Sequence, residues 1–125
     1  KVREGVASLR EQAERAGRDW RELEVAPQYI CRVDRDATKA QRDFETSQMY
    51  KHLVSLSKST LKDQGNIKLE DSNLIGTPAQ IVEKALALRD AGVTHLLGIY
   101  FAGHSVQDLL DQMQLFSEEV MPHLQ

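Results

Sequence analysis

Hydrophobic residues near the start of the chain recur every three or four positions, as they do on one face of an amphipathic helix. The residues of this stripe are Val2, Val6, Leu9, Ala13 and Ala16. They predict a helix over residues 2–16, which Gly17 would end in a left-handed conformation. The next apolar segment, 23–33, is rich in Val, Ile and Leu and predicts a strand. Pro27 fits the first residues or an edge of that strand, because proline cannot donate a hydrogen bond to a neighbouring strand.

The middle of the chain has a weaker pattern. Asp36 can cap a helix over residues 37–58, although polar residues interrupt the apolar stripe of that segment. The stretch 59–76 is polar, and Gly65 followed by Asn66 is a turn signal. We therefore predict a long loop over residues 59–76, and long loops in compact domains are usually functional or mobile.

The start of a further helix is marked by residues that hydrogen-bond to the first free amides of a helix. Thr77 suits the N-cap, Pro78 suits the first helical position, and Gln80 can complete a capping box. The pattern predicts a helix over residues 78–91, and Gly92 ends it.

The last part of the chain combines a strand-like run with one more helix. The mostly apolar run 94–101 predicts a strand that is covered on both faces, as in a parallel sheet. Gly103 breaks the run, and Ser105 with Asp108 three residues later begins a helix over residues 105–121.

The order of these elements predicts an α/β fold, since helices alternate with strands and imply parallel pairing. Two predicted strands do not make a stable parallel sheet by themselves. The chain also begins without Met, in what reads as a helix already under way. We therefore expect one segment, residues 1–125, that is either a piece of a larger α/β fold or a chain completed by association with other chains.

The composition of the chain limits the classes of partner that it can bind. The 125 residues suit one domain, and a net charge of −3 gives no basic excess to hold a nucleic-acid backbone. No apolar run approaches the length of a membrane span. The single cysteine, Cys31, excludes an internal disulfide and fits a reducing cytoplasm. We predict no metal site, because no histidine and carboxylate residues share a ligand-like spacing.

Three motifs in the last 50 residues resemble the carboxyl-terminal end of luciferase-like, flavin-dependent monooxygenases, the superfamily of bacterial luciferase (alkanal monooxygenase). The residues that carry the resemblance are Gly76, Thr77, Pro78, Ala91, Gly92, Val93, Phe116, Glu119, Val120 and Pro122. The upstream stretch from Ala13 to Gln28 resembles the helix and seventh strand of the same family. The resemblance implies a (β/α)8 TIM barrel, of which this chain would supply about the last quarter.

The same resemblance implies an activity for the intact protein. Members of the family bind reduced flavin, either FMN or the deazaflavin F420, and many insert one atom of O2 into a small organic substrate such as an aldehyde. A flavin reductase is a possible partner. Most catalytic positions of the family lie in earlier strands, so the catalytic residues stay unknown here. We expect the 125-residue chain by itself to be inactive and to hold no cofactor, because a quarter of a barrel cannot enclose one.

Six residues follow or end the two predicted strands, where a barrel carries its chemistry, namely Cys31, Arg32, Asp34, Tyr100, Phe101 and His104. All but Asp34 are candidates for the rim of a flavin pocket. Tyr100 and Phe101 could flank the flavin ring or simply pack in the core. Arg32 could hold an anionic flavin or be a solvated charge, and His104 could move a proton or lie in a surface loop. Cys31 is more simply a small buried apolar residue than a reactive thiol.

A second interpretation belongs to another class of function. The chain could be a non-catalytic interaction domain that self-associates through open strand edges and apolar helix faces. Under either interpretation we expect a homo-oligomer. Flavin binding by the complete protein distinguishes the two interpretations, because only the enzyme interpretation requires it.

Overall fold

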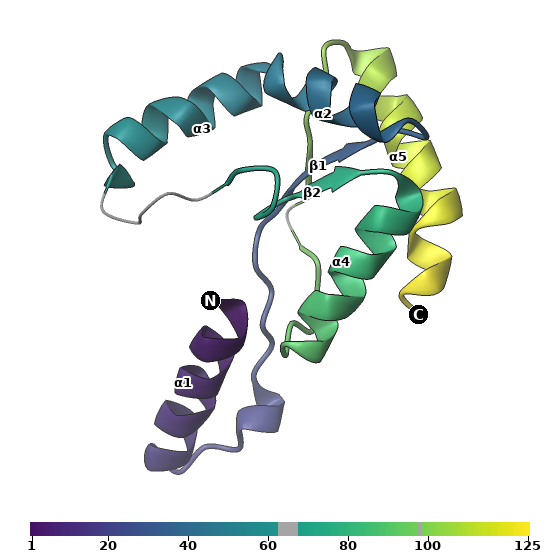
Figure 1. Ribbon diagram of the computed structural model, residues 1–125. Helices are drawn as coiled ribbons and strands as arrows, with labels where there is room; N and C mark the ends of the chain where they lie inside the picture. The colour runs from purple at the N-terminus through teal and green to yellow at the C-terminus, as the bar shows by residue number, and fades with distance from the viewer. Residues whose placement is uncertain (63–67, 98) are drawn as a thin grey trace.

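The computed structural model describes residues 1–62, 68–97 and 99–125, and it has an α/β fold built on one parallel sheet (Figure 1). The three strands are β1 (Ile30–Val33), β2 (Leu74–Gly76) and β3 (Tyr100–Phe101). Their order is β2-β1-β3, and both outer strands pair in parallel with β1. The predicted α/β class and parallel pairing are therefore confirmed, with three strands in place of about two.

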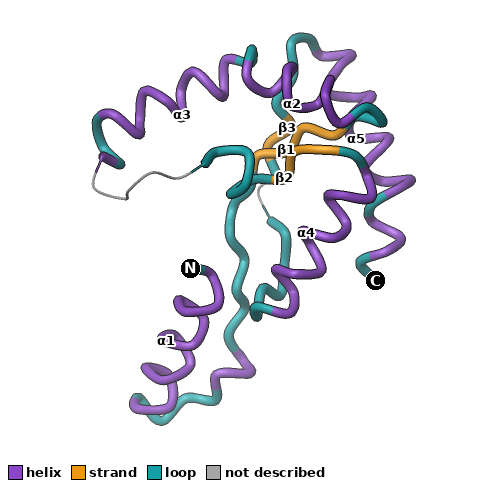
Figure 2. The backbone as a smooth tube through the Cα atoms, viewed as in Figure 1, coloured by secondary structure: helices purple, strands orange, loops and turns teal. Residues whose placement is uncertain are grey.

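The described residues form five α-helices and two short 3₁₀ helices. The α-helices are α1 (Val2–Arg15), α2 (Ala37–Glu45), α3 (Gln48–Lys58), α4 (Pro78–Asp90) and α5 (Val106–Glu119), and the 3₁₀ helices are η1 (Trp20–Glu22) and η3 (Met121–His123). In Figure 2 the strands lie between α2 and the pair α4 and α5. Helices on both faces of a parallel sheet remove its apolar side chains from water.

The core has two parts because successive residues of a strand point to opposite faces. Ile30 and Ile75 pack against Phe44 of α2 on one face. Cys31 and its neighbours pack on the other face against α4 and α5. The buried residues of that second part are Tyr29, Cys31, Val33, Leu74, Ile81, Phe116 and Val120. Burial of these side chains is the main source of stability of the sheet.

Helix α1 lies apart from the sheet and contacts the body at the turn after α4 (Figure 1). Gly92 in that turn has a φ of +104°, which favours glycine. A Cβ on Gly92 would lie 2.6 Å from Cγ1 of Val6 in α1. Gly92 is therefore required both by its backbone conformation and by the close approach of α1.

The predicted strand over residues 23–33 is wrong in length, since only Ile30–Val33 belong to the sheet. Strand β2 has three residues, so it can pair with the end of this segment and no more. Ahead of β1, the chain is tied to the opposite segment at one point. There the amide of Val25 donates to Oγ1 of Thr94 at 2.8 Å, and the carbonyl of Val25 accepts from the amide of Thr94 at 2.9 Å.

The predicted strand over residues 94–101 is also longer than the strand found. Only Tyr100–Phe101 pair with β1, and residue 98 lies outside the described residues. Leu97 is 57% exposed and Tyr100 is 50% exposed, so the run is not covered on both faces. The physical reason is that β3 is an edge: among the described residues it pairs with β1 alone.

The single helix predicted over residues 37–58 is two helices, separated at Thr46 and Ser47. Ser47 is extended (ψ 155°), and its buried Oγ accepts from the amide of Tyr50 at 3.1 Å and donates to the carbonyl of Phe44 at 2.6 Å. A serine that caps a new helix in this way competes with continuation of the old one.

The loop predicted over residues 59–76 contains strand β2 at its end. A three-residue strand is too short to show a strand period, which is why the pattern missed it. Lys84 of α4 fixes the approach to β2, because its Nζ donates to the carbonyls of Glu70, Asn73 and Ile75 at 3.0, 3.1 and 3.2 Å. The predicted turn at residues 65 and 66 lies outside the described residues.

The helix boundaries predicted from capping residues are confirmed to within about two residues. Thr77 and Gln80 form the capping box of α4, with Pro78 at its first position. The Oγ of Ser105 accepts from the amide of Asp108 at 3.1 Å and so caps α5. None of the described helices is long and apolar enough to cross a membrane.

Candidate functional site

The carboxyl ends of the three strands bring a set of charged residues together around Arg32. The Arg32 side chain is only 2% exposed, so the solvated alternative for this charge is wrong. Its Nη2 donates to Oδ2 of Asp43 at 2.9 Å, and its Nη1 donates to Oδ2 of Asp108 at 2.5 Å. Nη1 also donates to the carbonyl of Ala102, just after β3, at 3.0 Å. Arg32 therefore joins α2, α5 and the end of β3.

Lys39 extends this arrangement toward the end of β1. Its Nζ lies 2.8 Å from Oδ2 of Asp43 and 2.9 Å from Oδ2 of Asp34. Two cations, Arg32 and Lys39, therefore alternate with three carboxylates. We call Arg32, Lys39, Asp34, Asp43 and Asp108 the carboxyl-edge cluster.

Contacts within the cluster shift the pKa values of its members. The hydrogen bond from Lys39 and the nearby Arg32 charge lower the pKa of Asp43 below its ordinary value, against the effect of burial. Burial opposes ionisation of Asp108, but the hydrogen bonds from Arg32 and from the His104 amide outweigh it, so the pKa of Asp108 is also lowered. Hydrogen bonds to Asp43 and Asp34 raise the pKa of Lys39. All of these groups are held in their charged forms at neutral pH.

His104 lies at the outer margin of the cluster. Its amide donates to Oδ2 of Asp108 at 3.0 Å. Its Nε2 lies 3.1 Å from the carbonyl oxygen of Asp43 and 3.3 Å from Oγ1 of Thr46. The side chain is exposed, as the surface-loop interpretation expected. It contacts α2 at Asp43 and Thr46, whereas the contact with α5 is made by the backbone amide.

Gln112 is a buried polar residue that the sequence reasoning missed. It is 3% exposed, its Oε1 accepts from the amide of Val33 at 3.2 Å, and its Nε2 donates to the carbonyl of Ala102 at 3.0 Å. It therefore links the ends of β1 and β3. Its signal in the sequence was a polar residue on the apolar stripe of α5, four positions before Phe116.

The other candidate residues lie away from the cluster. Cys31 is fully buried on the opposite face of β1, and burial raises the pKa of its thiol to about 12. Phe101 packs edge-to-face on Phe116, with ring centroids 5.6 Å apart. Tyr100 is half exposed, and its hydroxyl lies 3.3 Å from Nε2 of Gln28. The structure thus brings Arg32 and His104 together and leaves these three elsewhere; contact of any of the five with a flavin stays a prediction.

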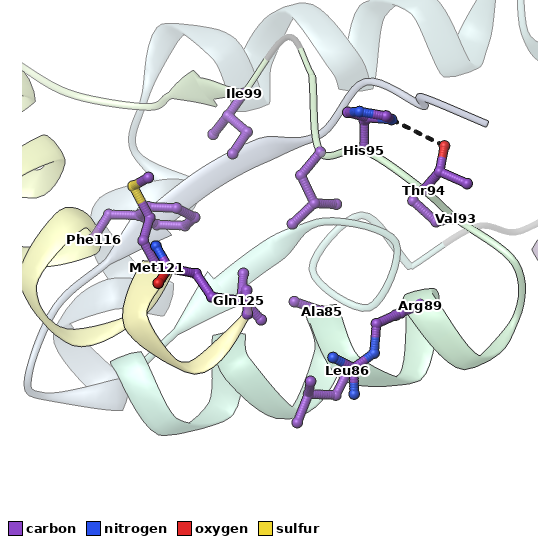
Figure 3. A pocket seen from close by; sticks show the side chains of 12 residues that line it. Ala85, Leu86, Arg89, Val93, Thr94, His95, Ile99, Phe116, Met121 and Gln125 are labelled. Carbon is purple, nitrogen blue, oxygen red and sulfur yellow. Dashed lines mark hydrogen bonds between the residues drawn. The ribbon is translucent and has the colours of Figure 1, made fainter. Parts of the chain in front are cut away.

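A mostly apolar hollow lies away from this edge of the sheet. Figure 3 shows it between α4, the segment before β3 and the carboxyl-terminal residues. Its volume is about 360 Å³. Ile99 and Phe116 line it, and Arg89 and His95 also contribute to its wall. It lies toward the amino ends of the strands, so it does not coincide with the carboxyl-edge cluster. Among the described residues no group of three His, Cys, Asp or Glu side chains is placed to hold a metal ion.

Comparison with known proteins gives a likeness in fold and none in sequence. No protein-family model matches the chain, and no curated protein matches its sequence. Twenty-two chains of solved structures match its fold. One is the monooxygenase RslO1 from Streptomyces bottropensis, with a TM-score of 0.73 and 20% sequence identity.

That match covers 99% of the present chain and 38% of the RslO1 chain. At this identity the likeness shows a shared fold alone. The present chain has the fold of a part of a larger monooxygenase chain and spans well under half of its length.

Proposed function

We propose that the chain is the carboxyl-terminal part of a luciferase-like, flavin-dependent monooxygenase with a (β/α)8 barrel. The observation that carries the proposal is the likeness of nearly the whole chain to part of RslO1, which is named a monooxygenase. Two further features support it. The capping box at Thr77 and the left-handed turn at Gly92 form at residues that carry the family resemblance. The sheet is also wholly parallel among the described residues, as a barrel sheet is, although its order β2-β1-β3 differs from the sequential order of barrel strands.

In the complete protein the reduced flavin, FMN or F420, would supply the redox chemistry, and a small organic substrate such as an aldehyde would receive one oxygen atom of O2. A flavin reductase would be the partner that renews the reduced cofactor. Both points rest on the family resemblance.

The residues of this chain do not form a flavin site by themselves. The Arg32 guanidinium is already neutralised by Asp43 and Asp108, so it is not free to hold an anionic cofactor. Cys31 is inside the core. Of the candidate residues only Tyr100 and His104 are exposed enough to contact a ligand, and we derive no catalytic step from them. We therefore expect the 125-residue chain to be catalytically silent.

The decisive experiment compares this chain with the product of the complete reading frame from which it comes. We expect the complete product to bind FMN or F420 in a fluorescence titration and to consume O2 when supplied with reduced flavin and an aldehyde. The 125-residue chain should do neither. If the complete product neither binds flavin nor consumes O2, the enzyme proposal fails.

A matched pair of variants of the complete product tests the position of the site. His104→Ala, at the carboxyl edge, should weaken flavin binding or change its pH dependence. His123→Ala, an exposed histidine of η3, should leave binding unchanged. Equal effects of the two substitutions would remove the carboxyl edge from the proposed site.

The exposed face of α5 favours a second candidate function, self-association without catalysis. Val106, Leu110 and Met113 lie at helical spacing and are 73%, 52% and 51% exposed. Contiguous apolar surface of this kind is typical of an interaction site. Sedimentation at increasing concentration tests it. Leu110→Glu should favour the monomer, whereas Gln12→Glu, which adds the same charge at an exposed position of α1, should not.

A further inference from the structure

Three arginines from three different elements line one hollow at the amino ends of the strands. The hollow has a volume of about 450 Å³ and lies between α1, η1 and the turn after α4. Its lining residues are Val6, Leu9, Arg10, Trp20, Arg21, Leu23, Val25, Arg89, Gly92, Val93 and Thr94. Val25 and Thr94 precede β1 and β3, so the hollow is at the opposite end of the sheet from the carboxyl-edge cluster.

Two of the three arginines of this hollow stack on the ring of Trp20. The guanidinium carbon of Arg10 lies 4.0 Å from the centroid of the Trp20 ring, and that of Arg21 lies 5.3 Å from it. Nη2 of Arg10 also lies 3.4 Å from the position that a Cβ on Gly92 would occupy. Arg10 therefore reaches from α1 across Trp20 to the turn after α4.

The charge of this hollow is poorly neutralised. Its lining contains no aspartate or glutamate. Within the described ranges, neither Arg10 nor Arg89 has a carboxylate at ion-pairing distance, and Nε of Arg10 is buried without a hydrogen-bond acceptor. Arg21 has an exposed partner, Asp19, at 3.4 Å. Like charges gathered between apolar walls produce a positive potential that attracts anions.

We propose that this hollow binds a small organic anion, namely a phosphate or carboxylate attached to a flat apolar group. Guanidinium groups present paired donors that match the two oxygens of such an anion. Val6, Leu23 and Val93 supply apolar walls for the attached ring. The volume lies in the range of small-molecule sites, roughly 300–1,000 Å³. The site is independent of the proposed monooxygenase function and of the carboxyl-edge cluster.

Trp20 is the single tryptophan of the chain, so its fluorescence reports on this hollow directly. The test titrates the 125-residue chain with phenyl phosphate, with calorimetry as a second readout. We expect a saturable change in emission and a matching heat. Arg10→Gln and Arg89→Gln should each weaken binding at least about tenfold, because each removes a charge-assisted hydrogen bond. Arg3→Gln, an exposed residue of α1 outside the lining, removes the same charge and should leave binding unchanged.

Two further ligands separate the sources of affinity. Inorganic phosphate should bind more weakly than phenyl phosphate, since it lacks the ring, and benzyl alcohol should not bind, since it lacks the charge. Because Arg89 does not stack on Trp20, Arg89→Gln keeps the test valid if Arg10→Gln perturbs folding. The proposal is overturned if phenyl phosphate gives no saturable signal at millimolar concentration, if benzyl alcohol binds equally well, or if Arg3→Gln weakens binding as much as Arg89→Gln does.

Discussion

Arg32 and Asp108 are 76 positions apart in the chain, and their side chains meet with Nη1 and Oδ2 2.5 Å apart. The pair connects the central strand to the first turn of α5. Asp43 of α2 completes the neutralisation of Arg32 from the other side. One buried cation therefore fixes helices on both faces of the sheet relative to β1, and its removal affects the fold as a whole.

Replacement of Arg32 by methionine should lower the free energy of unfolding by about 3–5 kcal/mol, because it leaves Asp43 and Asp108 partly buried without their shared partner. Arg35→Met is the matched control, since Arg35 is mostly exposed and pairs with Glu119 at the surface. Urea unfolding followed by circular dichroism measures both. A similar small loss for the two variants would mean that the buried pair contributes little.

Stability should fall in acid, and Asp108 and Asp43 should account for part of the loss. The pKa values of both are lowered in the folded state, so their stabilisation is present above the ordinary Asp pKa of about 3.9 and is lost as pH falls through the lower folded values. Asp108→Asn should flatten the dependence of unfolding free energy on pH below about 4. Asp111→Asn, exposed on the same helix, should leave that dependence as it is in the parent.

Cys31 should be unreactive in the folded chain. It is fully buried, and burial raises the pKa of its thiol to about 12, so almost no thiolate is present at pH 8. Because the chain has one cysteine, a thiol-reactive reagent reports on this residue alone. We expect labelling to be negligible in buffer and complete in urea. Rapid labelling of the folded chain would place Cys31 at an accessible surface.

Gly92→Ala should destabilise the chain and loosen α1. The new Cβ meets Cγ1 of Val6 at 2.6 Å, and the φ of +104° is strained for alanine. We expect a loss of about 1–3 kcal/mol, of which Val6→Ala in the same chain should restore only the steric part. Gly5→Ala is the opposite control. No atom lies within 4 Å of its would-be Cβ in α1, so it should stabilise the helix by about 0.5–1 kcal/mol.

Lys84→Met should release the segment before β2. The ammonium group of Lys84 holds three backbone carbonyls, and methionine keeps the length of the side chain but none of its donors. Hydrogen exchange should therefore speed up at the amides of β2 and of the residues just before it, with less change in α1. Exchange that is unchanged at β2 would show that strand pairing alone fixes this segment.

The sequence by itself determined the features that depend on neighbouring residues. The capping box at Thr77, the N-cap at Ser105 and the left-handed Gly92 are local arrangements, and their residues predict them. The α/β order follows from the helical and apolar patterns for the same reason. Fully buried Cys31 was also predictable, since a cysteine within an apolar run is usually a small core residue.

Only the tertiary structure decided the length of the strands and the state of Arg32. A strand extends only as far as it has a pairing partner. Strand β1 is short because β2 offers few residues to pair with, and β3 is short because its outer side is an open edge among the described residues. Arg32 is buried because Asp43 and Asp108 arrive from distant helices to neutralise it, and no local pattern contains that information. The arginine-lined hollow has the same origin, since α1, η1 and α4 each contribute one cation and only their packing brings the three together.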